Sequence, residues 1–120
     1  MSLFNTGDFV LHSGKKSNFL IDCDSLTDED LNALAKRVAQ TVTFSNVIAI
    51  PPNGGLRFAF ALAPYADPKE SKNLIVDDVY TTGGSMEEMK KKIGGDPIGV
   101  VIFARSKPNW WIKALFQSNL

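Results

Sequence analysis

The hydrophobic pattern of this chain divides into short apolar runs and longer stretches in which apolar positions recur every three to four residues. The short runs predict buried strands at 47–50, 74–76 and 98–104. The longer spacing between residues 27 and 44 predicts an amphipathic helix that Ser25 or Thr27 caps. Further helices are predicted at 56–63, from Ser85 to Gly94 and at 108–116.

This alternation of strands and helices predicts an α/β fold in which an open, mainly parallel sheet is flanked by helices. The chain has 120 residues, so a single domain over residues 1–120 is expected. Such sheets bind their ligands at the carboxyl ends of the strands. The candidate site therefore consists of the polar segments that follow the three predicted strands, at 51–57, at 77–85 and from 105 onward.

Charge and composition argue against several kinds of partner and structural feature. Thirteen basic and thirteen acidic side chains cancel, so bulk charge favours neither nucleic acid nor an anionic membrane as a partner. No apolar run approaches the roughly 18 residues of a membrane span. Cys23 is the only cysteine and His12 the only histidine, which excludes an internal disulfide and a Cys/His metal cluster. A reducing cytoplasm is the expected location.

The segment 74–86 reads LIVDDVYTTGGSM and places two acids, three hydroxyls and two glycines between a strand and a helix. Its second half can wrap a phosphate, because glycines let backbone N–H groups approach, hydroxyls donate, and the helix directs its positive end at the anion. The residues of this predicted phosphate cradle are Thr81, Thr82, Gly83, Gly84 and Ser85. The alternative is an ordinary connection in which Ser85 is the N-cap of a capping box with Glu88.

Asp77 and Asp78 follow the apolar run directly. Carboxylates repel a phosphate at direct contact, so this pair is predicted to accept hydrogen bonds from sugar hydroxyls or to hold the waters of a hard cation nearby. Two such acids beside a phosphate cradle suit a ribose 5-phosphate.

The same segment resembles the phosphoribosyl pyrophosphate (PRPP) signature of type I phosphoribosyltransferases. The resemblance implies an enzyme that transfers the 5-phosphoribosyl group of PRPP to a nitrogenous base and releases pyrophosphate. It implies that PRPP is bound by Asp77, Asp78 and the cradle, and that both aspartates are catalytic because they position the ribose and stabilise its developing positive charge. Mg²⁺ carried with PRPP would neutralise pyrophosphate, with Asp78 as a ligand through water. A homodimer is also implied.

Residues 7–17 are similar to the N-terminal stretch of orotate phosphoribosyltransferases, where this stretch helps to form a hood over the base. The resemblance implies a reduced N-terminal hood here and favours an orotate-like pyrimidine as the acceptor. For His12 and Lys15 a solvated turn is the alternative. Arg105, directly after the strand at 98–104, matches an arginine that contacts the base in those enzymes. Trp110 and Trp111 can stack on a planar ring or can belong to the core.

Pro52, Asn53, Gly54 and Arg57 resemble the pyrophosphate-binding loop of the family by position. Arg57 lies in the first turn of a predicted helix, where a cation opposes the helix dipole, so a bound anion would offset its placement. An arginine that extends into solvent is the alternative.

The chain lacks the strand and the long mobile catalytic loop that full-length orotate enzymes have between the positions of Ala66 and Asn73. Closure of such a loop excludes water and completes the charge around the leaving group. The missing loop therefore leaves a second function open, a PRPP- or nucleotide-binding regulatory protein without turnover. A structural role with an empty site is a third.

Overall fold

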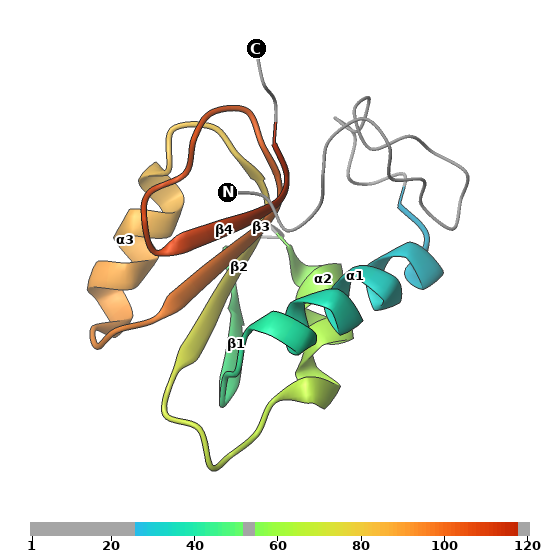
Figure 1. Cartoon of the computed structure of the whole chain (residues 1–120). Coiled ribbons are helices and arrows are strands. Elements are labelled where there is room, and N and C mark those ends of the chain that lie inside the picture. Colours follow the sequence, from blue (N-terminus) through green and yellow to red (C-terminus); the bar gives the residue numbers. More distant parts are fainter. Residues whose placement is uncertain (1–25, 52–54, 118–120) are drawn as a thin grey trace.

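Four parallel strands in the order β1-β2-β3-β4 form the centre of the computed structural model, which describes residues 26–51 and 55–117 (Figure 1). The strands are β1 (Asn46–Ala49), β2 (Asn73–Tyr80), β3 (Ile98–Ala104) and β4 (Ile112–Gln117). The helices are α1 (Asp28–Thr41), α2 (Leu56–Leu62), the 3₁₀ turn η3 (Ala63–Tyr65) and α3 (Gly84–Ile93). The predicted α/β fold is confirmed, whereas the predicted N-terminal hood lies outside the described residues.

Helices cover both faces of the sheet (Figure 1). On one face, α1 and α2 pack against alternate side chains of β2, namely Leu74 and Val76. On the other face, Ile75 packs with Met86 of α3 and with Trp111. Because side chains alternate along a strand, each strand contributes to two cores.

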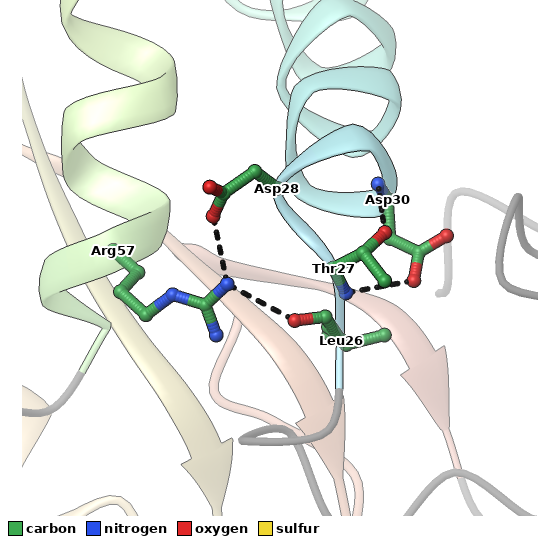
Figure 2. Close-up of polar contacts among 5 residues, drawn as sticks. All are labelled: Leu26, Thr27, Asp28, Asp30 and Arg57. Carbon is green, nitrogen blue, oxygen red and sulfur yellow. Dashed lines mark hydrogen bonds and ion pairs between the residues drawn. The ribbon is translucent and has the colours of Figure 1, made fainter.

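Helix α1 is the predicted amphipathic helix, slightly shorter at both ends. Leu31, Leu34 and Val38 are buried at the expected spacing. Thr27 is the N-cap: its backbone N–H donates to the Asp30 carboxylate at 2.9 Å, and the Asp30 N–H donates to the Thr27 hydroxyl at 3.1 Å (Figure 2). The reciprocal pair satisfies two donors at the start of the helix, and Asp30 is completely buried in making it.

The predicted helix at 108–116 is wrong, because this segment contains β4. Without β4, the backbone N–H and C=O groups along one edge of the buried β3 would lack partners. β4 supplies them from Gly99↔Ile112 to Ala104↔Gln117. The segment is rich in tryptophan, isoleucine and phenylalanine, which favour strands where tertiary pairing is available.

Two crossover connections have opposite hands. The steps from β1 to β2 and from β2 to β3 move in the same direction across the sheet. The first passes through α2 on one face and the second through α3 on the other. Because about 98% of such crossovers are right-handed, one of the two is an exception to a strong rule.

The connection between α2 and β2 is only residues 63–72, including η3. This agrees with the prediction that the long catalytic loop is missing here. Within the described part of the chain, no helix has the length and apolar character needed to cross a membrane.

Replacing Thr27 by Ala is expected to lower the free energy of unfolding by about 1 kcal/mol, because the backbone N–H of Asp30 loses the Thr27 hydroxyl that accepts its hydrogen bond and caps α1. Urea unfolding followed by circular dichroism measures the change. The control is Thr43→Ala, an exposed threonine after the end of α1, which is expected to change stability by less than about 0.5 kcal/mol. Equal effects of the two substitutions would contradict the role of the cap.

Candidate functional site

The paired acids lie within β2, and not after its end as the sequence predicts. β2 continues to Tyr80 because β3 pairs with it that far, through Asp77↔Val101 and Tyr80↔Ala104. β1 pairs with β2 only as far as Val76, where the N–H of Ile50 donates to the Val76 carbonyl at 3.0 Å. Beyond Val76, β2 is therefore held by the sheet on one side and is free of β1 on the other.

The backbone around the acids is closely packed. The N–H of Asp78 donates to the Asp77 carboxylate and the N–H of Val79 donates to the Asp78 carboxylate, both at 2.8 Å. Beyond the last residue of β2 that pairs with β1, Gly55 packs directly on Asp77. A Cβ at Gly55 would lie 2.9 Å from the Asp77 Cα. Gly55 also has φ +69°, so both space and backbone conformation require glycine. Its role was not predicted from the sequence.

Burial above all, with the hydrogen bond and the negative charge of Asp78, raises the pKa of the Asp77 carboxyl to about 7, although the hydrogen bond from the Asp78 backbone N–H lowers it in part. The side chain is half-buried and has an acid as its neighbour, so it is protonated in a substantial fraction of molecules near neutral pH. A ligand that donates hydrogen bonds to the carboxylate, or a nearby cation, would favour its charged form.

The predicted phosphate cradle forms a small hollow at the start of α3. The hollow has a volume of about 50 Å³, and its lining includes Asp77, Tyr80 and the whole segment from Thr81 to Ser85. The side chains of Thr81, Thr82 and Ser85 are exposed. The structure thus brings the first acid and the cradle into one site.

The N-cap of α3 is Gly83, with φ 84°, and no side chain caps the helix. The alternative in which Ser85 caps the helix is therefore wrong, and the Ser85 hydroxyl lies in the first helical turn. A Cβ at Gly83 would lie 2.6 Å from the Tyr80 hydroxyl, so the buried Tyr80 ring also leaves room only for glycine. The first N–H groups of a helix have no acceptor within it, and here they point at the cradle.

Arg105 directly follows β3 and lies, as predicted, at the same rim as the cradle, that is, at the edge of the sheet formed by the carboxyl ends of the strands. Its backbone N–H donates to the Tyr80 carbonyl at 2.9 Å, and the Ser106 hydroxyl donates to the Thr81 carbonyl at 2.8 Å. These two bonds fasten the end of β3 to the end of β2, while the Arg105 side chain remains exposed. Ser106 had no recognisable signal in the sequence.

Arg57 reaches toward the start of α1 (Figure 2). Its guanidinium donates to the Leu26 carbonyl at 3.0 Å and to the Asp28 carboxylate at 2.8 Å. Asp28, and not a bound anion, thus supplies the negative charge that offsets the placement of Arg57 in the first turn of α2. The Arg57 side chain is therefore not simply extended into solvent. Pro52, Asn53 and Gly54 lie outside the described residues, as do His12 and Lys15.

The two tryptophans are far from the rim along β3. Ile112 pairs with Gly99 near the start of β3, so Trp110 and Trp111 lie near the amino ends of the strands, opposite to Arg105. Trp111 is buried in the core with Met86, and its indole N–H donates to the Glu87 carboxylate. The core alternative is therefore correct for Trp111, and stacking of either ring on a base at this rim is not supported.

The known proteins that are similar to this chain in sequence and the solved structure that is similar to it in fold are all phosphoribosyltransferases. The orotate phosphoribosyltransferase of Pyrococcus horikoshii is 30% identical over 128 aligned positions, which take in 80% of this chain and 69% of that protein. That of Methanopyrus kandleri is 28% identical over 123 positions, with 80% of this chain and 67% of that protein covered. No protein-family model matches the chain.

The xanthine-guanine-hypoxanthine phosphoribosyltransferase structure from Helicobacter pylori superposes with a TM-score of 0.55 over 75% of this chain and 80% of that one. At 13% identity this likeness shows a shared fold. The fold and the relatives together define a phosphoribosyltransferase, a class of enzymes. The chain belongs to the type I phosphoribosyltransferase family.

Within the aligned region, this chain has fewer residues than the two orotate phosphoribosyltransferases. Both alignments extend over more positions than the chain has residues, yet they take in only 80% of it. The relatives therefore have internal residues that this chain lacks, and the chain spans about two thirds of their length.

The raised pKa of Asp77 predicts that stability falls as the pH rises. The group binds a proton more tightly in the folded than in the unfolded chain, so its contribution is complete below about pH 4 and is lost as the pH rises through about 7. Asp77→Asn is expected to flatten this decline and to raise stability at pH 8. The rise is expected to fall well below the full conversion of about 1.36 kcal/mol per pKa unit, because solvent screens the half-exposed carboxylate.

Urea unfolding between pH 4 and 8, without ligand and with a chelator, measures this dependence. The matched control is Asp67→Asn, an exposed carboxylate outside the hollow, which is expected to leave the decline intact. A decline of the same slope in Asp77→Asn would show that another group causes it.

Proposed function

We propose that this chain transfers the 5-phosphoribosyl group of PRPP to a nitrogenous base, with an orotate-like pyrimidine favoured, and releases pyrophosphate. The observation that carries the proposal is that Asp77 shares one hollow with the complete Thr81–Ser85 cradle, in a chain of the phosphoribosyltransferase family. A phosphate at the start of α3 and a ribose beside Asp77 fit this arrangement.

In this proposal the cradle binds the 5-phosphate through backbone N–H groups and the hydroxyls of Thr81, Thr82 and Ser85. Asp77 and Asp78 position the ribose hydroxyls and stabilise the positive charge that develops on the sugar as pyrophosphate leaves. No covalent nucleophile is needed, because the acceptor nitrogen attacks carbon 1 directly.

Mg²⁺ would arrive with PRPP and neutralise the pyrophosphate charge. Among the described residues there is no group of three or more His, Cys, Asp or Glu side chains that could hold a metal ion. Asp78 is the residue that would hold the ion, through water.

The base is assigned to the rim near Arg105. The guanidinium is a planar fork that matches a carboxylate or paired carbonyls of an acceptor. The hydrogen bond from the Arg105 backbone N–H to the Tyr80 carbonyl fixes the backbone of Arg105. The position from which its side chain can reach a base is therefore well defined. The Arg57 guanidinium already donates to Leu26 and Asp28 through one nitrogen, so a pyrophosphate contact would have to use its other N–H groups or replace these bonds.

The second candidate is a PRPP-binding regulatory protein without turnover. The short connection of residues 63–72 favours it, because this is where the resemblance to orotate phosphoribosyltransferases implies a catalytic loop. A homodimer in the cytoplasm is part of both proposals.

Pyrophosphate release from PRPP and Mg²⁺, measured with orotate and with a panel of other bases, tests the proposal. Release with a pyrimidine supports it in full. A PRPP-dependent rise in melting temperature without any release would favour the regulatory protein. Absence of both would contradict PRPP binding altogether.

The double substitution Asp77→Asn with Asp78→Asn is expected to lower kcat by at least about 100-fold, because the charge that stabilises the sugar cation is removed. The fold is expected to persist, since two neighbouring carboxylates repel each other. The control pair, Asp67→Asn with Asp96→Asn, changes two exposed acids outside the hollow and is expected to keep full activity. Unfolding of the first pair in circular dichroism would make the acids structural.

Arg105→Lys is expected to weaken use of the acceptor by roughly 1–3 kcal/mol in kcat/KM, because lysine keeps the charge but loses the planar fork. KM for PRPP is expected to change little. Lys107→Arg, an exposed cation on the same loop, is the control and should affect neither. If Arg105→Lys lowers PRPP affinity as much as acceptor use, Arg105 belongs to the phosphate or pyrophosphate site.

A further inference from the structure

Tyr80, the last residue of β2, is buried at the wall of the hollow that contains the phosphate cradle. Its side chain is 5% exposed and packs with Ile50 and Met86 in the core on the α3 side of the sheet. The lining of the hollow includes Tyr80 together with the cradle. The hydroxyl lies against Gly83, the N-cap of α3, because a Cβ at Gly83 would be 2.6 Å from the Tyr80 oxygen. The tyrosine ring therefore reaches from the core to the start of α3, where the cradle lies.

The Tyr80 hydroxyl has no hydrogen-bond partner in the part of the chain that the structure describes. Most buried polar side-chain atoms do have one, because an unpaired group keeps the full cost of its removal from water. The other hydroxyls that line the hollow, those of Thr81, Thr82 and Ser85, are exposed and can bond to water. Within this lining, Tyr80 thus offers a buried donor that a ligand can satisfy.

The charge of the hollow makes each neutral donor important. Its lining, which consists of described residues, contains the acid Asp77 but no lysine or arginine, so an anion there must be held by backbone N–H groups and hydroxyls. An exposed hydroxyl exchanges a bond to water for a bond to the ligand, and the net gain is small. A buried, unpaired hydroxyl gives up no such bond, and its bond to an anion is strengthened by the low local dielectric constant.

We propose that the Tyr80 hydroxyl donates a hydrogen bond to a phosphate oxygen of the ligand in the cradle. The inference rests on the proposed function in taking that ligand to be a phosphate ester, and it adds to the site a donor that comes from the core. The Tyr80 backbone is fixed, because β3 pairs with it at Ala104 and the Arg105 N–H donates to its carbonyl at 2.9 Å. The donor is therefore in place before the ligand binds, so little conformational freedom is lost on binding.

Tyr80→Phe tests the contact, because it removes the hydroxyl and keeps the ring. Calorimetric titration measures the Kd of ribose 5-phosphate and of inorganic phosphate. Both are expected to rise by roughly tenfold or more, as for the loss of a hydrogen bond to a charged group. The matched control is Tyr65→Phe, which changes the other tyrosine of the chain, in η3 and outside the lining of the hollow. It is expected to bind both ligands like the unmodified chain.

Stability without ligand separates a binding role of the hydroxyl from a structural one. Tyr80→Phe is expected to be at least as stable as the unmodified chain in urea unfolding without phosphate, because an unpaired buried hydroxyl is removed. A hydroxyl with a partner inside the protein would give the opposite sign, since its loss would lower the free energy of unfolding. The expected result is therefore weaker phosphate binding by a protein that is no less stable.

Four results would overturn the inference. These are an unchanged Kd of ribose 5-phosphate in Tyr80→Phe, a loss of stability in this variant without ligand, no phosphate binding by the unmodified chain, and a weakening confined to ribose 5-phosphate, which would assign the hydroxyl to the sugar. Failure of the proposed reaction gives a different result. A chain that binds ribose 5-phosphate through Tyr80 but releases no pyrophosphate from PRPP contradicts the transferase and leaves this inference standing.

Discussion

The unequal pairing of β2 with its two neighbours is the constraint on which the candidate site depends. β3 holds β2 as far as Tyr80, whereas β1 ends opposite Val76. The next residue, Asp77, therefore stands on a rigid strand with one side released from the sheet. Gly55 packs on the Asp77 backbone, and Asp77 also lines the hollow of the cradle. Rigid support together with local space is what a precise binding site requires.

The short connection between α2 and β2 explains the opposite hands of the two crossovers. The resemblance to orotate enzymes assigns a strand and a long loop to this position, and the relatives do have internal residues that this chain lacks. A strand inserted here and paired on the outer edge of β1 would reverse the direction of the step through α2. Both crossovers would then have the same hand. We infer that the direct step from α2 to β2 makes the connection β1-α2-β2 the exception.

Most of the fold could be predicted from hydrophobic periodicity, and its failures have physical causes. β4 was mistaken for a helix because its sequence carries no strict alternation, and the unpaired edge of β3 decided the outcome. β2 was predicted too short because its polar half is stabilised by pairing with β3, which sequence does not display. In the site, the cradle and Arg105 follow from their position after strands. The contacts of Gly55, Ser106 and Arg57 join segments far apart in sequence, so no local pattern could reveal them.

Helix α2 is fixed at its start by contacts to two separate parts of the structure. It begins after Gly55, which is fixed against Asp77, and within two turns it presents Phe60. Arg57, between them, bonds to Leu26 and Asp28 and so fixes the same helix to the start of α1. A seven-residue helix held at both of these points has little freedom to rotate without moving Gly55.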